Sequence, residues 1–151
     1  MKKVITLFLA VCIALPLFAQ VRGKINIPDL KGYVTLKCDF HMHTIFSDGR
    51  VRPDTRVDEA YREGLDAISI TEHLEGRMFP NDIVGSQNRA YETALPSAEL
   101  KDIILIKGAE FTRDMPPGHL NAIFLSNADG LNKPDYMDAL RAAKAQNAFI
   151  F

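Results

Sequence analysis

Hydrophobic residues along the 151-residue chain switch repeatedly between strand-like and helix-like spacing. Short runs rich in β-branched and aromatic residues, separated by glycine, proline and polar residues, are typical of strands. The run at 103–107 is almost continuously apolar, as in a parallel sheet whose strands are buried on both faces. Five such runs predict strands, over residues 34–40, 66–71, 103–107, 120–125 and 148–151.

Three segments between these runs carry apolar residues at helical spacing. The clearest helix begins at Pro53, which suits a first helical turn, and ends near Gly64. A second helix is predicted over roughly 84–95, and a third begins at Pro134. The apolar face of the first helix repeats every three or four residues, at Val57, Ala60, Tyr61 and Leu65.

Alternating strands and helices predict an α/β protein built from parallel βα units. The units could close into a barrel or form an open, doubly wound sheet. No glycine-rich dinucleotide fingerprint follows the first predicted strand, and no phosphate-binding loop is present. Both architectures place their active sites at the carboxyl ends of the strands. Candidate chemistry is therefore expected in the residues that follow each strand.

The first nineteen residues have the pattern of a secretory signal peptide. Lys2 and Lys3 precede an apolar run over 4–17, and Ala19 is small enough for cleavage. A membrane anchor is the alternative, but a spanning helix needs ~20 apolar residues. We therefore expect an exported protein, periplasmic or extracellular. The expected organisation is a signal peptide at 1–19, an N-terminal segment at 20–33 and a domain at 34–151.

Composition excludes several other classes of protein. The chain has 18 Lys and Arg against 19 Asp and Glu, and 47% of its residues are hydrophobic. This balance is typical of a globular protein and provides no basic surface for nucleic acid. Of the two cysteines, only Cys38 lies beyond the predicted signal peptide. We expect no disulfide framework and a buried Cys38 thiol.

All four histidines lie at the ends of predicted strands. His41 and His43 close the first strand, and the two-residue period of a strand projects both from one face, where they could chelate a transition metal. His73 follows the second strand, and His119 precedes the fourth. Glu110 follows the apolar third strand, and a carboxylate buried there needs a charged partner or a cation.

Each of these residues also has an ordinary structural explanation. Asp48, in a Ser-Asp-Gly segment, is typical of a turn. A single histidine such as His73 is usually a hydrogen-bonded polar residue. Arg50 and Arg113 lie just beyond two of the clusters and could bind phosphate oxygens or remain solvated surface groups. Several such clusters occur along the chain, each at the end of a predicted strand, and this repetition favours a metal site over these alternatives.

The clusters form an ordered series of motifs within residues 35–151: Asp-Phe-His-Met-His-Thr, Ser-Asp-Gly, Ile-Thr-Glu-His, Gly-Ala-Glu-Phe and Gly-His-Leu-Asn-Ala-Ile. This series resembles the polymerase and histidinol phosphatase (PHP) domain family, in its stand-alone phosphoesterase branch. Glu72 stands where that family commonly has Asp. The resemblance implies the N-terminal part of a distorted seven-stranded β/α (TIM-like) barrel. It also implies up to three divalent metal ions, Zn, Mn or Fe, at the strand ends.

The resemblance assigns six residues as metal ligands: His41, His43, Asp48, His73, Glu110 and His119. His41, His43 and Glu110 would form one site and act in catalysis through metal-activated water. Glu110 would bridge to a second site that His119 also ligates, and the remaining pair would serve a third. The family completes these sites with a later histidine and an Asp-x-His motif. Neither occurs before Phe151, so we expect the domain to be incomplete at its C-terminus.

The expected function is metal-dependent hydrolysis of a small phosphate mono- or diester. Glu110 as a bridge would hold two metal ions ~3.5–4 Å apart, the spacing of two-metal phosphoesterases. One alternative is a metal-dependent C–N or lactone hydrolase, and another is a metal-binding module without catalysis. We expect a small phosphorylated substrate as the partner, with no nucleic acid and no stable membrane insertion after signal cleavage. Arg50 and Arg113 are the candidate substrate-binding residues.

Overall fold

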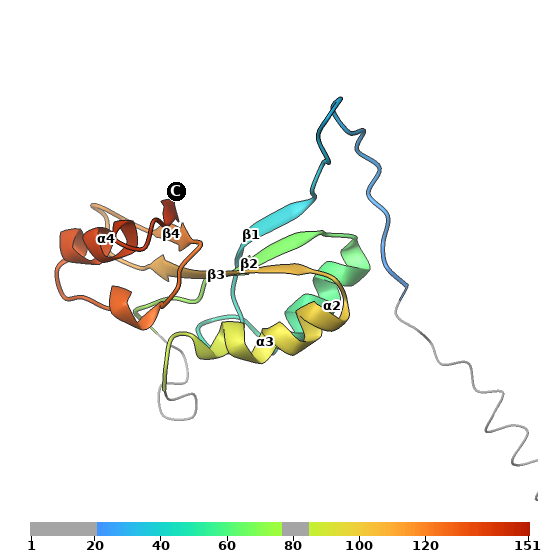
Figure 1. Ribbon diagram of the computed structural model, residues 1–151. Helices are drawn as coiled ribbons and strands as arrows, with labels where there is room; N and C mark the ends of the chain where they lie inside the picture. The colour runs from blue at the N-terminus through green and yellow to red at the C-terminus, as the bar shows by residue number, and fades with distance from the viewer. Residues whose placement is uncertain (1–20, 77–84) are drawn as a thin grey trace, which may run out of the picture.

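The computed structural model describes residues 21–76 and 85–151. These residues form a five-stranded sheet with helices packed against it. The strands follow one another across the sheet in sequence order. They are β1 (Cys38–Met42), β2 (Ala67–Ile70), β3 (Ile104–Phe111), β4 (Leu120–Ile123) and β5 (Phe149–Ile150). In Figure 1, β3 runs from the part of the sheet formed with β1 and β2 to the part formed with β4.

Helices connect the strands within the described residues. Helix α2 (Pro53–Glu63) links β1 to β2, and α3 (Arg89–Leu100) precedes β3. The short 3-10 helix η1 (Asp129–Leu131) and helix α4 (Tyr136–Lys144) link β4 to β5. Figure 1 shows α2 and α3 together on one side of β1 to β3, with α4 beside β4. Helix α2 ends where predicted, because Gly64 adopts a left-handed φ of 83° that favours glycine.

The direction of β4 departs from the predicted all-parallel sheet. Strands β1, β2 and β3 are parallel, as predicted, whereas β4 is antiparallel to both β3 and β5. A parallel pair needs a crossover of about a dozen residues or more, usually a helix. The segment 112–119 between β3 and β4 contains no helix, so the chain returns directly in the opposite direction. The expectation of parallel strands is therefore wrong for β4 alone.

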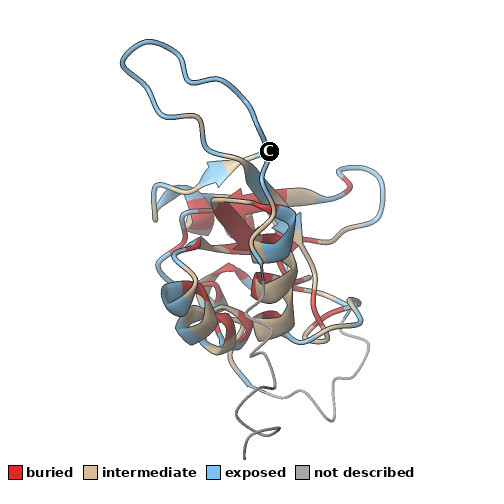
Figure 2. Ribbon diagram, turned by 90° about the vertical axis from the view of Figure 1, so that its right-hand side faces the viewer, coloured by how far each residue is buried: buried red, intermediate tan, exposed pale blue. Residues whose placement is uncertain are grey.

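Two apolar clusters hold the helices against the sheet. One lies between α2, α3 and the first three strands and includes Val57 and Ile68, both fully buried. The other lies between α4, η1 and the strands β3 and β4 and includes Phe111 and Leu131. Figure 2 shows the buried residues gathered in the strands and in parts of the helices. Strand β3 contributes to both clusters and so joins them into one framework.

Several element boundaries differ from the prediction. The second helix begins at Arg89 rather than near residue 84. Its buried face consists of the small residues Ala90, Ala94 and Ala98, and alanines give a weak hydrophobic period from which to predict its boundaries. Strand β3 continues to Phe111, so Glu110 lies inside the strand rather than after it. Strand β1 begins at Cys38 rather than at residue 34.

Two expectations of burial are wrong. Cys38 is exposed, because β1 is an edge strand of the described sheet. Ile104 is 51% exposed, so the first half of β3 is not covered on both faces. The apolar run at 103–107 therefore indicated a strand correctly but overstated how deeply it is buried.

The predicted signal peptide at 1–19 lies outside the described residues. The described part of the N-terminal segment forms no helix or strand before Cys38. Asp66 anchors this segment through ion pairs of 2.6 Å to Arg22 and 2.6 Å to Lys37. Hydrogen bonds from Lys37, together with both cations, hold the pKa of Asp66 below its usual value. No helix in the described part of the chain is both long and apolar enough to span a bilayer.

Candidate metal centre

Six side chains that can bind metal lie at one edge of the sheet. Parallel strands bring their carboxyl ends to the same edge, which places the residues after β1 and β2 near the end of β3. Because β4 runs in the opposite direction, its amino end reaches this edge too. The residues brought together are His41, His43, Asp48, His73, Glu110 and His119.

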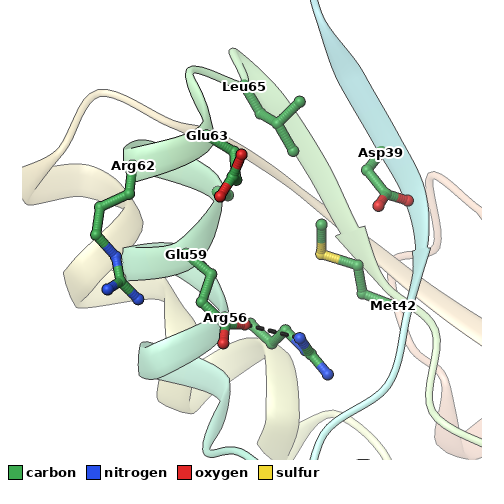
Figure 3. Close-up of a pocket in the computed structure, with 8 residues that line it drawn as sticks. Asp39, Met42, Arg56, Glu59, Arg62, Glu63 and Leu65 are labelled. Carbon is green, nitrogen blue, oxygen red and sulfur yellow. Dashed lines mark hydrogen bonds and ion pairs between the residues drawn. The ribbon is translucent and has the colours of Figure 1, made fainter. Parts of the chain in front are cut away.

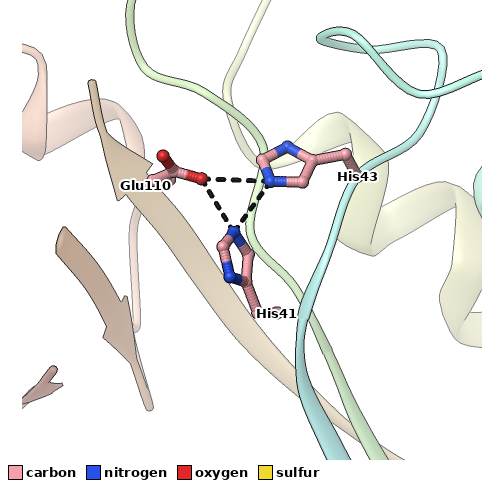
Figure 4. A group of neighbouring side chains, drawn as sticks. All are labelled: His41, His43 and Glu110. Carbon is pink, nitrogen blue, oxygen red and sulfur yellow. Dashed lines mark hydrogen bonds and ion pairs between the residues drawn. The ribbon is translucent and has the colours of Figure 1, made fainter. Parts of the chain in front are cut away.

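Glu110 lies at the centre of this group and is 1% exposed. Its Oε2 atom is 2.9 Å from His41 Nε2 and 3.0 Å from His43 Nε2. Its Oε1 atom is 2.5 Å from His119 Nδ1 and 3.5 Å from His73 Nδ1. Figure 4 shows His41 and His43 facing Glu110. Each oxygen thus faces a different pair of imidazoles, the arrangement expected of a bridging carboxylate.

The backbone of Glu110 is fixed by the segment after β2. Its N–H group donates to the Glu72 carbonyl at 2.9 Å, and its carbonyl accepts from the Leu74 N–H at 2.9 Å. These two hydrogen bonds seat His73 directly beside Glu110. The relative position of the two side chains is therefore set by main-chain hydrogen bonds, not only by their own contact.

The donor atoms fall into three groups that share members. Within each group, one donor atom from every residue lies within 4.8 Å of the others. His41 Nε2 and His43 Nε2 are 3.0 Å apart, so their donors converge on one point. Imidazole nitrogens and carboxylate oxygens suit divalent metal ions, and the residues therefore fit such a centre. The groups are His41, His43 and Glu110; His43, Asp48 and His73; and His73, Glu110 and His119.

Burial and neighbouring charges adjust the protonation of this region. Burial and then the nearby His73 lower the pKa of His43, although Glu110 opposes them. Burial favours the neutral form of Asp48, but the hydrogen bond and charge of His73 outweigh it and lower the Asp48 pKa. Burial raises the pKa of Glu72 against the hydrogen bonds it accepts. A neutral imidazole and an ionised carboxylate are the forms that bind metal.

Thr112 orients His73, a role that the sequence did not reveal. Its Oγ1 atom lies 2.5 Å from His73 Nδ1, while His73 Nε2 lies 3.3 Å from Asp48 Oδ2. The two ring nitrogens therefore face different partners. A single hydroxyl residue just after a strand has no spacing pattern, so only its position after β3 could have suggested this contact.

The two arginines predicted to bind substrate have different surroundings. Arg113 Nη2 forms an ion pair of 2.8 Å with Glu75, and the guanidinium also donates to the carbonyls of residues 133 and 134. Glu75 in turn accepts a hydrogen bond from the Thr112 N–H at 2.9 Å. Arg113 therefore stabilises the main chain at Thr112, the residue that contacts His73. Arg50 is exposed, close in sequence to Asp48.

A separate groove of about 460 Å³ lies between β1 and α2, and Figure 3 shows most of the side chains around it. None of the six candidate ligands lines this groove. Arg56, on its wall, pairs with Glu59 at 2.7 Å and donates from Nε to the His43 carbonyl at 2.9 Å. Arg56 therefore ties α2 to the main chain of a candidate ligand. The lining residues are Asp39, Met42, Arg56, Glu59, Ala60, Arg62, Glu63 and Leu65.

The loop that carries Asp48 folds tightly against the end of β1. The N–H groups of Ser47 and Gly49 both donate to the Thr44 carbonyl, at 3.1 and 2.9 Å. A Cβ atom on Gly49 would lie 2.5 Å from the His43 carbonyl oxygen and 2.6 Å from the Thr44 nitrogen. Main-chain atoms cannot move aside as a flexible side chain can. Glycine is therefore required for this loop conformation.

Gly49→Ala is expected to displace Asp48 and weaken metal binding about tenfold, the effect of disturbing groups that orient metal ligands. Overpacking should also lower the free energy of unfolding by ~1–3 kcal/mol. Titration calorimetry with Zn²⁺ and urea unfolding measure the two effects. Gly130→Ala is the matched control, since a Cβ atom there meets its nearest neighbour at 3.9 Å. Equal behaviour of the two variants would contradict the prediction.

Comparison with known proteins agrees with the motif series. Residues 39–146 match the family model of the PHP domain. A two-domain protein from Bacteroides vulgatus, described as containing a predicted PHP-like metal-dependent phosphoesterase, is 59% identical, with a TM-score of 0.86. The match covers 88% of this chain and 39% of that one. The uncharacterized protein MJ1295 of Methanocaldococcus jannaschii is 36% identical over 86 residues, which are 54% of this chain and 36% of that protein.

An amidohydrolase from Chromobacterium violaceum shares the fold at 17% identity, with a TM-score of 0.51, over 72% of this chain and 32% of that one. The chain thus spans about two fifths or less of the length of each of these proteins. The curled five-stranded α/β sheet is consistent with part of a TIM-like barrel, and the predicted seven-stranded closure stays a prediction. Since the family model matches more than half of its residues, the chain belongs to the PHP domain family.

Proposed function

We propose that the protein is a metal-dependent phosphoesterase that hydrolyses a small phosphate mono- or diester. The observation that carries the proposal is the pair of buried Glu110 oxygens, each facing two imidazoles. A carboxylate shared in this way supports two or more divalent ions, for which Zn, Mn and Fe are our candidates. Membership of the PHP family and the likeness to the Bacteroides vulgatus protein support the same chemistry.

The cluster has a buried floor and an open rim, which suits access by a small substrate. The side chains of Glu110 and His73 are 2% and 12% exposed, whereas those of Asp48 and His119 are 51% and 55% exposed. Substrate would therefore approach from the side of Asp48 and His119. Arg50 lies near this rim in sequence, and we propose that it binds phosphate oxygens. The ion pair with Glu75 makes Arg113 less available for this role.

The residues of the chain prepare the site in three ways. Glu110 fixes the spacing of the donor groups, because both of its oxygens are engaged and its main chain is held by two hydrogen bonds. His41 and His43 present Nε2 atoms toward the same Glu110 oxygen. Divalent ions bound there would polarise phosphoryl oxygens and lower the pKa of water. No serine or cysteine nucleophile is needed for this reaction class.

Turnover of bis-p-nitrophenyl phosphate and p-nitrophenyl phosphate tests the proposal. The protein is dialysed against a chelator and then reloaded with Mn²⁺ or Zn²⁺. We expect hydrolysis only after reloading, with the preferred ester distinguishing a diesterase from a monoesterase. Hydrolysis of lactone or amide probes alone would favour the C–N or lactone hydrolase. Stoichiometric metal without hydrolysis of any probe would favour a metal-binding module.

A further inference from the structure

A second buried carboxylate lies beside the metal centre and belongs to none of its donor groups. Glu72, which precedes His73, is 5% exposed. Its Oε1 atom accepts hydrogen bonds from the Thr44 N–H, at 3.0 Å, and from the Thr44 hydroxyl. Its Oε2 atom accepts the Ser47 hydroxyl. Thr44 and Ser47 are fully buried, so three donors of one loop end on one carboxylate.

The direction of these hydrogen bonds determines what Ser47 can offer to His43. A serine hydroxyl has a single proton, which Ser47 donates to Glu72. The Ser47 oxygen therefore has only lone pairs for His43 Nδ1, 3.2 Å away. His43 must carry its proton on Nδ1 to complete this contact. Asp48 Oδ1, 3.4 Å from the same nitrogen, favours the same tautomer.

The other ring nitrogen of His43 faces the metal centre. His43 Nε2 lies 3.0 Å from Glu110 Oε2 and 3.0 Å from His41 Nε2. With the proton on Nδ1, the Nε2 lone pair points to the position that a metal ion would occupy. Hydrogen bonds to the second ring nitrogen commonly set the tautomer and orientation of metal-binding histidines in this way.

The Thr44 contacts act on the loop rather than on the ring. The Phe46 N–H donates to Thr44 Oγ1 at 3.2 Å, which directs the Thr44 hydroxyl proton to Glu72. The Thr44 carbonyl accepts the hydrogen bonds that close the loop at Ser47 and Gly49. Glu72 therefore holds both ends of the turn from Thr44 to Ser47, which Asp48 directly follows.

We propose that Glu72 is a positioning residue of the metal centre, which acts through Ser47 to hold His43 in the tautomer with Nε2 free for metal and through Thr44 to hold the Asp48 loop. This inference rests on the metal centre of the proposed function but not on the reaction catalysed there. The longer Glu side chain, in place of the family's common Asp, makes the contacts to both hydroxyls. Glu72→Asp is expected to lose at least one of them.

The test compares Glu72→Gln, Ser47→Ala and the double variant. Ring ¹⁵N chemical shifts of His43 in the metal-free protein report the tautomer, and competition with a chelator gives the Zn²⁺ affinity. We expect the Nδ1–H form in the parent chain. In Glu72→Gln the amide can donate to Ser47, so the hydroxyl turns toward His43 and the Nε2–H form grows. Zn²⁺ affinity should fall about 10–100-fold, the usual effect of removing a group that orients a metal ligand.

Ser47→Ala should shift the tautomer in the same sense, and it serves if Glu72→Gln does not fold. Both residues act through one chain of hydrogen bonds. The Zn²⁺ affinity of the double variant should therefore be no lower than that of the single variant with the lower affinity. Leu131→Ala is the control for a purely structural effect: it removes contacts of the other core cluster, between α4, η1 and the strands β3 and β4, and should lower stability without changing the tautomer.

Two results would overturn the proposal. One is an Nε2–H tautomer of His43 in the parent chain. The other is a loss of Zn²⁺ affinity in Glu72→Gln with the Nδ1–H tautomer unchanged, which would assign Glu72 a structural role only. Turnover of phosphate esters is not among the readouts, so a failure of the phosphoesterase proposal shows itself separately.

Discussion

Glu110→Ala is expected to abolish metal binding at the two donor groups that share Glu110 and to lower metal-dependent phosphate-ester turnover roughly a thousandfold, the loss of several kcal/mol of charge stabilisation. Glu110 belongs to two of the three donor groups, and each of its oxygens faces two imidazoles. Of the two carboxylates among the candidate ligands, Glu110 faces four imidazoles and Asp48 faces two. Its removal therefore disturbs several donor groups at once, whereas loss of His119 removes a donor from one group.

Stability in the presence of metal gives a second measurement of the same variant. Ligand at a hundredfold excess over its Kd stabilises a folded protein by about 2.7 kcal/mol. Zn²⁺ should raise the free energy of unfolding of the parent chain by roughly that amount and that of Glu110→Ala by much less, since only the group of His43, Asp48 and His73 remains. Glu99→Ala, on the exposed face of α3, is the matched control and should behave like the parent chain. Retention of the full Zn²⁺ stabilisation in Glu110→Ala would contradict the assignment.

The alternation of strands and helices predicted the parallel half of the sheet because the signals there are local. Helix α2 has a proline at its start, a clear apolar period and a glycine at its end. The reversal of β4 was not predicted, since the direction of a strand depends on how the chain returns between strands. Residues 112–119 contain no helical pattern, and their shortness is the signal that favours an antiparallel return.

The same reversal explains why a residue before a strand joins residues that follow strands. His119 precedes β4, so a parallel β4 would have carried it to the opposite edge of the sheet. Its position 2.5 Å from Glu110 depends on the antiparallel pairing of β3 and β4. The motif order alone suggested a shared site, and the antiparallel topology supplies the physical reason.

The candidate ligands could be predicted, but the groups that orient them could not. Histidine and acidic residues at strand ends are few, so their coincidence carries information. Thr44, Ser47 and Thr112 are ordinary hydroxyl residues whose roles depend on contacts with residues distant in the sequence. Glu72 had one signal, its place in a motif where the resembling family has Asp. That signal did not reveal that its carboxylate holds the loop after β1.

Phe111→Ala should have the largest effect on stability, a loss of ~3–5 kcal/mol in the free energy of unfolding. Phe111 is fully buried, and its ring meets Tyr136 edge to face at a centroid distance of 6.3 Å. It packs in the cluster that includes Leu131 and Ala139. Urea unfolding of the metal-free chain measures the loss. Phe149→Ala is the control, because Phe149 is 59% exposed and its truncation should change stability by about 0.5 kcal/mol or less.

Successive residues of a strand point to opposite faces, so Phe111 and Glu110 separate the two functions of β3. Glu110 faces the imidazoles, and Phe111 faces the core under α4. Phe111→Ala should therefore lower stability while the folded fraction keeps its Zn²⁺ affinity within about tenfold. Glu110→Ala should show the opposite pattern. Loss of metal binding in a folded Phe111→Ala variant would show that core packing, and not only main-chain hydrogen bonding, holds Glu110 in place.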